Sequence, residues 1–224
     1  MRESIEKPKY IPENIEYSKD LVDIIRKCTI DQIQEKMKIN EKIALQVKDM
    51  YKNIKFDING YAAIDSFDGL QYKRLNYRSL GNDSKEYINK NILIYTGLYG
   101  MIRPLDSIYP HRLDFDMKFD LYNFWKDILA KQLPDEDILD ISSNEFMKAV
   151  DKYMGKNYYK VFFKEYKNGK LISKATESKI MRGNFTRYLA ENKINKIKDM
   201  LQYNDYGYKF IGAIEKNEII FIKK

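Results

Sequence analysis

Apolar residues recur at helical spacing over the first quarter of the chain. Residues 14–27 have one apolar face and predict a helix. Thr29 and Gln32 form a capping-box pattern, which predicts the start of a short helix. After a three-residue turn, Asn40 is a favourable N-cap for a further helix, whose apolar stripe consists of Ile43, Val47, Met50 and Ile54. The sequence therefore predicts three helices, of which the last two are joined tightly.

The rest of the chain mixes short apolar runs with amphipathic segments. The predicted strands lie at residues 61–67, 92–96, 138–141, 208–214 and 218–222, and the predicted helices at 84–91, 121–133, 143–150 and 177–192. Residues 112–119 alternate between apolar and polar side chains, which predicts a half-buried strand. Asn168-Gly169 separates the β-prone runs 159–166 and 171–175, and this is the signature of a type I′ hairpin. The pattern indicates an α+β fold with a mixed β-sheet wrapped by helices.

Length and composition are those of a globular protein. The chain has 224 residues, no repeats and no Pro/Gly-rich linker, so we expect a single domain over residues 1–224. Apolar runs are at most four residues long, too short to span a bilayer, and the N-terminus lacks the apolar stretch of a signal peptide. We therefore expect a cytoplasmic protein without a membrane partner.

A single Cys and a single His exclude several chemistries. The chain cannot form an internal disulfide, and a structural zinc site would lack its usual ligands. A Cys–His or Ser–His–Asp catalytic device would have to use Cys28 or His111. Oxygen ligands for Mg²⁺, Mn²⁺ or iron exist, but nothing in their spacing demands a metal: Asp106, Asp114, Asp116 and Glu145. No catalytic residue, metal site or cofactor is assigned.

Positive charge is concentrated in two segments. The formal net charge is +7, but residues 36–55 carry +4 and residues 156–193 carry +7, which leaves −4 for the remainder. Two basic segments on a slightly acidic background favour a polyanionic partner such as nucleic acid or phosphate. The alternative is a solvated basic surface.

The predicted helix at 177–192 has a basic face. Its core face contains Met181, Phe185, Tyr188 and Leu189, and the opposite side contains Lys179, Arg182, Thr186 and Arg187. Gly183 lies among these cations, although glycine in a helix interior costs roughly 1 kcal/mol relative to alanine. This placement suggests that the backbone or phosphate of a partner approaches closely. A tolerated surface glycine is the alternative.

The two helices around the turn 38–40 are similar to a helix-hairpin-helix. Such a pair offers turn amides and a helix N-terminus to DNA phosphate without reading bases. Lys38, Asn40 and Lys42 would hold the phosphate, and Glu41 would oppose it. The usual turn glycine is missing, although Asn40 can adopt a left-handed conformation. An ordinary helical hairpin in the core is the alternative.

Residues 97–125 carry a family resemblance. Gly97-Leu98-Tyr99-Gly100 match neither a Walker loop nor a dinucleotide fingerprint. With Arg103-Pro104-Leu105-Asp106, Tyr109-Pro110, Arg112-Leu113 and Leu121-Tyr122-x-Phe124-Trp125, however, the chain resembles the YaaA family of bacterial peroxide-stress proteins. Shorter stretches also fit: Phe67-Asp68-Gly69, residues 142–150 (SSNEFMKAV), residues 179–183 (KIMRG), Arg187-Tyr188, Glu191-Asn192 and Gly207-Tyr208.

This resemblance implies a single mixed α/β domain with a helix-hairpin-helix and a positively charged cleft. It also implies sequence-independent binding of double-stranded DNA and a peroxide-stress role that limits free iron and oxidative DNA damage. The residues expected to contact DNA are Lys38, Asn40, Lys42, Arg103, Arg112, Lys179, Arg182, Gly183 and Arg187.

The chain departs from the family in three places. The family's first strand, which ends in Ser-Pro-Ala-Lys, is expected to be missing, because the chain starts at Met1-Arg2-Glu3; a misassigned start codon is the alternative. Ile180 occupies a position that is often basic, and His111 one where relatives commonly have Tyr.

Two other functions remain open. In an enzyme acting on a phosphorylated small molecule or a nucleic-acid end, Arg182 would clamp phosphate, and Glu145 or Asp106 would act as acid/base or metal ligand. An iron-handling protein would use the carboxylates. The sequence identifies no protein partner.

Overall fold

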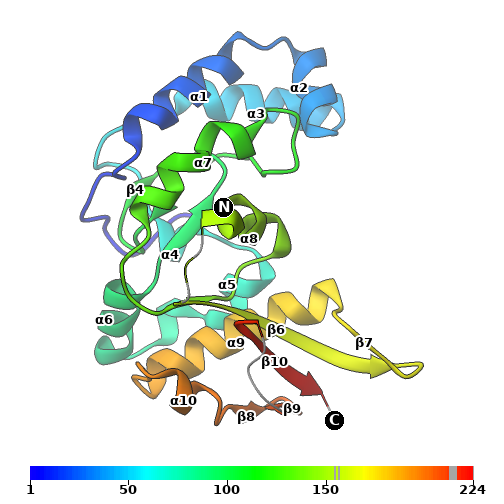
Figure 1. Cartoon of the computed structure of the whole chain (residues 1–224). Coiled ribbons are helices and arrows are strands. Elements are labelled where there is room, and N and C mark those ends of the chain that lie inside the picture. The colour runs from blue at the N-terminus through cyan, green and yellow to red at the C-terminus, as the bar shows by residue number, and fades with distance from the viewer. Residues whose placement is uncertain (154, 156, 212–215, 224) are drawn as a thin grey trace. The chain divides into compact units, whose positions relative to one another are not determined.

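The computed structural model describes residues 1–153, 155, 157–211 and 216–223 of the chain (Figure 1). The chain forms two compact units, each assembled from three separate stretches. Unit 1 comprises Met1–Phe67, Ile92–Leu133 and Asn144–Lys152, and unit 2 comprises Asp68–Asn91, Pro134–Ser143 and Tyr153–Lys224. Helices and strands are mixed in the chain as an α+β fold requires, which confirms the predicted fold class. A single domain over residues 1–224 stays a prediction.

Unit 1 begins with the three predicted helices, α1 (Ile15–Lys27), α2 (Ile30–Met37) and α3 (Glu41–Asn53). The capping box is present, because the Thr29 hydroxyl accepts the Gln32 amide and the Gln32 side chain accepts the Thr29 amide. Helix α3 packs against both α1 and α2. Of its predicted stripe, Val47 and Ile54 are buried, whereas Ile43 and Met50 are half-buried, and Ala44 and Tyr51 complete the buried face. Local periodicity and capping therefore account for this part of the fold.

The remainder of unit 1 consists of short elements. They are β1 (Tyr61–Ala62), α4 (Ala63–Ser66), β2 (Ile94–Thr96), β3 (Gly100–Ile102), β4 (Ser107–Ile108), α7 (Leu121–Gln132) and α8 (Asn144–Val150). A 3₁₀ turn, η2 (Asp151–Tyr153), begins in unit 1 and ends at the first residue of the last stretch of unit 2. Strands β1 and β4 pair antiparallel, and so do β2 and β3. The predicted strand at 61–67 is wrong beyond its second residue, because the chain turns into α4.

The predicted strand at 112–119 is also wrong. Burial does alternate there, with Leu113, Phe115 and Met117 buried, but the backbone forms turns. The Phe115 amide donates to the Glu145 carboxylate at 2.8 Å, and the Met117 amide donates to the Asp114 carbonyl at 3.2 Å. These donors are therefore directed away from any strand partner. Alternation of apolar and polar residues therefore indicates which side chains are buried. A segment is a strand only if its backbone also forms hydrogen bonds with a neighbouring strand.

The core of unit 1 is organised around a buried indole. Trp125 of α7 is fully buried, and its Nε1 donates to the Gly97 carbonyl at 2.8 Å. Tyr17 of α1 and Phe124 meet the indole edge-on. A Cβ at Gly97 would lie 2.2 Å from the Leu113 carbonyl oxygen, so only glycine fits where these segments cross. The residues that carry the family resemblance thus form a packing centre.

Unit 2 contains a mixed sheet and the helices that cover it. Its elements are α5 (Leu70–Leu75), η1 (Tyr77–Ser79), α6 (Asn82–Asn91), β5 (Ile138–Asp140), β6 (Tyr158–Lys167), β7 (Lys170–Ile172), α9 (Ala175–Glu191), α10 (Ile197–Met200), β8 (Asn204–Asp205), β9 (Tyr208–Phe210) and β10 (Glu218–Lys223). The strand order is β5-β6-β10-β9-β8, and β7 pairs with β6. Strands β5 and β10 run parallel to β6 while the other pairs are antiparallel, which confirms the predicted mixed sheet. The predicted strand 208–214 ends at Phe210, and its residues 212–214 lie outside the described part.

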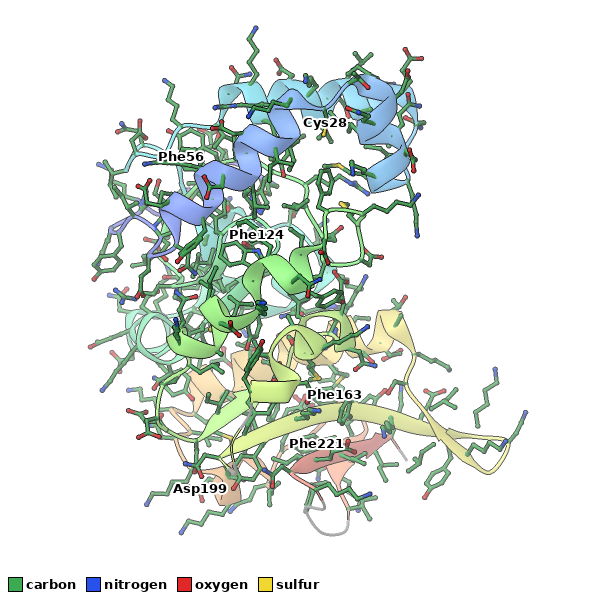
Figure 2. The ribbon with its side chains drawn as sticks, turned by 45° about the horizontal axis from the view of Figure 1, so that its top comes forward. Cys28, Phe56, Phe124, Phe163, Asp199 and Phe221 are labelled. Carbon is green, nitrogen blue, oxygen red and sulfur yellow. The ribbon has the colours of Figure 1, made fainter. Side chains whose placement is uncertain are left out.

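The predicted hairpin is present. Asn168 and Gly169 have φ of 53° and 75°, the pair of positive values that a type I′ turn requires. Behind it, stacked Phe163 and Phe221 with centroids 5.4 Å apart belong to the aromatic core between the sheet and α9 (Figure 2). Phe185 of α9 joins them, as the predicted core face of that helix requires.

Gly183 of α9 is buried against α5. A Cβ at this position would lie 2.2 Å from the Gln71 carbonyl oxygen, 2.7 Å from the Arg74 Cβ and 3.0 Å from the Leu75 amide nitrogen. The two helices make one of the most extensive contacts within unit 2. The missing side chain is therefore required by helix packing. This corrects both sequence interpretations of Gly183, as an approach point for phosphate and as a surface glycine.

We expect Gly183→Ala to destabilise the fold by about 3 kcal/mol, because a methyl group would overlap backbone atoms of α5. Gly81→Ala is the matched control in the same unit, since a Cβ there would meet no atom within 4 Å. The control should change stability by less than about 0.5 kcal/mol in urea denaturation. Equal stabilities of the two variants would contradict the packing explanation.

His111 is held as a neutral ring in unit 1. Its Nδ1 lies 2.8 Å from the Tyr109 carbonyl oxygen, and Tyr99 and Phe67 meet the ring edge-on. Burial lowers the pKa of His111 from the ordinary 6.5 to about 4, and the hydrogen bond to Tyr109 opposes the shift. Because the unfolded chain binds this proton more readily, stability must fall as the pH falls from about 6.5 towards 4.

We therefore expect the wild type to lose about 2 kcal/mol more stability than His111→Phe between about pH 7 and pH 5. Urea denaturation of both proteins at the two pH values measures this difference. The comparison cancels the titration of carboxyl groups, which both proteins share. Parallel losses in the two proteins would show that the fold does not lower the pKa of His111.

Candidate nucleic-acid interface

The turn between α2 and α3 is built by two caps. Lys38 ends α2 in the left-handed conformation, with φ 53° and ψ 50°, and both its amide and that of Ile39 donate to the Gln34 carbonyl. Asn40 is extended, with φ −76°, and its Oδ1 accepts the Ile43 amide at 3.0 Å. The left-handed residue is thus Lys38, whereas the sequence offered Asn40 for that conformation.

This turn presents three of the predicted DNA-contacting residues to solvent. Lys38, Asn40 and Lys42 are all exposed, and they lie on the turn and the first helical residues of α3. Glu41 is exposed beside them. The basic neighbour Lys36 is turned away, because its Nζ donates to the Lys118 carbonyl and lies 5.4 Å from the Phe119 ring centroid.

Arg103 and Arg112 lie in the loops of unit 1. Arg103 is exposed, with its guanidinium 5.8 Å from the Tyr10 ring centroid, and its amide donates to Asp106 at 2.9 Å. Arg112 is exposed, and its carbonyl accepts the Tyr51 hydroxyl. Both guanidinium groups are therefore available to an anion.

On α9, Lys179 is exposed while Arg182 is half-buried. The Arg182 Nε has no hydrogen-bond partner among the described residues. Burial lowers the pKa of Arg182, and the negative charge of buried Asp140 opposes that shift. Asp140 itself accepts the Tyr158 hydroxyl and the Ser142 amide. Arg182 is thus a poorly solvated cation whose buried Nε is unpaired within the described part of the chain.

Arg187 has a structural role in unit 2. Its Nη1 donates to the carbonyls of Leu75 and Asn76 and to the Ser79 hydroxyl, at 2.9–3.3 Å. Its Nη2 pairs with Glu191 at 2.7 Å. The guanidinium therefore caps the end of α5, and little of its hydrogen-bonding capacity remains for a phosphate.

The predicted contact residues divide between the two units. Unit 1 holds Lys38, Asn40, Lys42, Arg103 and Arg112, and unit 2 holds Lys179, Arg182, Gly183 and Arg187. The structure describes the positions of the residues of each set within their own unit. A single cleft lined by both sets stays a prediction.

The carboxylates proposed for acid/base chemistry serve the backbone. Burial raises the pKa of Glu145, whose Oε1 accepts the Phe115 amide at 2.8 Å. Burial likewise raises the pKa of Asp106, which accepts the Arg103 amide. Among the described residues, no three His, Cys, Asp or Glu side chains are grouped so as to hold a metal ion.

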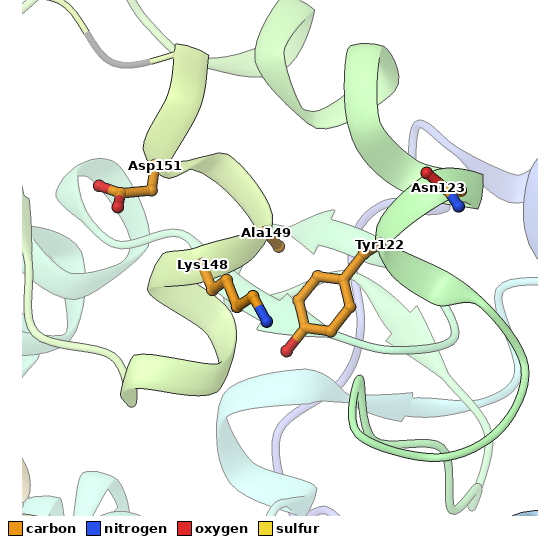
Figure 3. A pocket seen from close by; sticks show the side chains of 5 residues that line it. All are labelled: Tyr122, Asn123, Lys148, Ala149 and Asp151. Carbon is orange, nitrogen blue, oxygen red and sulfur yellow. The ribbon is translucent and has the colours of Figure 1, made fainter.

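A shallow pocket of about 460 Å³ lies between α7 and α8 (Figure 3). It is lined by Tyr122, Asn123, Lys148, Ala149 and Asp151. The Lys148 ammonium lies 5.1 Å from the centroid of the Tyr122 ring. No pattern in the sequence indicated this pocket, although Tyr122 and Lys148 belong to stretches that carry the family resemblance. Its lining joins one cation to one carboxylate, which gives it no net preference for phosphate.

Comparison with known proteins confirms the resemblance. Residues 2–213 match the family described as peroxide stress protein YaaA. A UPF0246 protein of Clostridioides difficile is 36% identical over 225 residues, which cover 96% of this chain and 91% of the relative. A UPF0246 protein of Finegoldia magna is 37% identical, with 91% and 85% covered, and one of Desulfitobacterium hafniense is 30% identical, with 96% and 90% covered. The chain therefore belongs to the peroxide stress protein YaaA family, and its role lies in peroxide stress.

Proposed function

We propose that the protein binds double-stranded DNA through its phosphates, without regard to sequence, as part of its role in peroxide stress. The observation that carries the proposal is the turn between α2 and α3, where Lys38 and Lys42 are exposed on either side of the start of a helix. The net charge of +7 supports it, because a basic protein attracts a polyanion from a distance.

The chemistry of this turn suits a phosphate. The first amides of a helix have no acceptor within the helix, and the helix dipole adds partial positive charge at the same end. Asn40 accepts the Ile43 amide, which leaves the two helical amides before Ile43 as the candidates to bind a phosphate oxygen. Two lysines supply full charges, and they outweigh the single opposing charge of Glu41. Such a site holds a phosphate oxygen and reads no base.

We also propose that the peroxide-stress role consists in limiting free iron and oxidative DNA damage. The family membership supports this finer role. No helix in the described part of the chain is long and apolar enough to cross a membrane. The proposal includes no protein partner.

Replacement of both Lys38 and Lys42 by alanine should weaken binding and flatten its salt dependence. Each lost phosphate contact lowers the slope of log K against log salt by about 0.9, so the double variant should lose about 1.8. Fluorescence anisotropy of a labelled duplex of about 25 base pairs, titrated at several salt concentrations, measures both quantities.

Lys126→Ala/Lys131→Ala is the matched control, because it removes two exposed lysines from α7 in the same unit. If the two double variants bind with the same affinity and slope, the turn is not the contact site.

A second candidate function rests on Arg182. Its guanidinium is half-buried, and the buried Nε has no hydrogen-bond partner among the described residues. The planar fork of an arginine is suited to a phosphorylated small molecule or a nucleic-acid end. Glu145 and Asp106 of unit 1, whose pKa values are both raised by burial, are separate candidates for acid/base chemistry.

Glu145→Gln separates the two candidates. The amide oxygen can still accept the Phe115 amide, so the fold should persist while the ionisable group is lost. We expect DNA affinity to change by less than about twofold, because Glu145 belongs to no proposed phosphate contact. Hydrolysis of p-nitrophenyl phosphate or of labelled duplex ends by the wild type, abolished in the variant, would favour the enzyme instead.

A further inference from the structure

Strands β6 and β7 form a ribbon that extends beyond their sheet. Strand β10 pairs with β6 as far as Glu165, opposite Lys223, and β7 pairs with β6 from Glu165 to Lys167. The segment that follows Glu165 is therefore a two-stranded ribbon closed by Asn168-Gly169, and it projects from the sheet in Figure 1. Among the described residues, the core of unit 2 contains Val161 and Phe163 of β6 and no residue of the ribbon beyond Glu165.

The tip of the ribbon carries an unfavourable pair of charges. Lys167 lies directly opposite Lys170, and both are exposed. Like charges opposed across two strands are destabilising. Neither lysine has a carboxylate partner among the described residues, whereas Lys174 pairs with Glu165 at 2.5 Å. Four lysines against one glutamate between residues 164 and 174 make this ribbon strongly basic.

The opposite face of the tip is apolar. Tyr166 is directly across from Leu171, and their side chains are 64% and 38% exposed. Because successive side chains of a strand point to opposite faces, this pair lies on the other side of the ribbon from Lys167 and Lys170. The tip thus combines an exposed aromatic–aliphatic pair with two long cationic side chains, all on a two-stranded support.

We propose that the β6–β7 ribbon is a second DNA contact of this protein, with its tip in the major groove. A major groove admits a two-stranded β-ribbon. Tyr166 and Leu171 face the base edges, and the long side chains of Lys167 and Lys170 reach the phosphates that border the groove. Phosphate relieves the repulsion between the opposed lysines, which explains a charge arrangement that costs stability in the free protein. The inference rests on the proposed function, since it assumes a duplex as partner.

The test uses the full chain and a labelled duplex of about 25 base pairs in anisotropy titrations at several salt concentrations. Lys167→Ala/Lys170→Ala should reduce the salt slope by about 1.8. Tyr166→Ser/Leu171→Ser should weaken binding severalfold while the slope stays unchanged, because it removes contacts and no charge. Lys196→Ala/Lys198→Ala, which removes two exposed lysines elsewhere in unit 2, should alter neither. Circular dichroism and thermal denaturation establish that each variant is folded.

The outcomes separate this inference from the proposed function. If the wild type binds the duplex and the Lys167/Lys170 variant binds with the same affinity and slope, the ribbon is not a contact, and the proposal for DNA binding stands. A reduced slope with no effect of the Tyr166/Leu171 variant overturns the groove placement and leaves a phosphate contact alone. If the wild type does not bind the duplex at all, both proposals fail.

Discussion

The fold depends on buried or half-buried carboxylates that accept backbone amides in irregular segments. Asp65 accepts the amides of Ile5 and Glu6, Asp106 accepts that of Arg103, and Glu145 accepts that of Phe115. Elements of two to four residues leave many amides without a partner in a helix or sheet, and a buried unpaired amide is costly. A carboxylate has several lone-pair sites, so it can accept hydrogen bonds from amides that no helix or sheet pairs.

This constraint changes how the acidic residues are interpreted. A carboxyl group whose pKa is raised by burial is usually a candidate acid or base, and Asp106 and Glu145 both fit that description. Each of them is also the acceptor that fixes a loop, so its burial has a structural cause. Lys38 and Lys42 differ from these carboxylates, because both lysines are exposed at the turn between α2 and α3. The chemistry open to a partner is therefore mainly cationic.

Local signals predicted the elements that local physics determines. The capping box at Thr29 and the Asn168-Gly169 turn need only neighbouring residues, and both are where the sequence places them. The strand expected at 112–119 failed because its amide donor is taken by Glu145, thirty residues farther along. The role of Arg187 was likewise hidden, since the carbonyls that it caps lie more than a hundred residues earlier in the chain. Contacts between distant segments leave no pattern in a single sequence.

In the family stretch Lys-x-x-Arg-Gly, the glycine and the arginine have different roles. The glycine leaves room for α5 so closely that any of the other amino acids would collide with the Gln71 carbonyl, whatever its polarity. Selection for a stable fold is enough to keep this position constant, even in a relative that had lost its ligand. The arginine beside it is half-buried, and its Nε has no partner in the described part of the chain. A relative whose function has diverged would therefore be expected to have another residue at position 182 and still to have glycine at position 183.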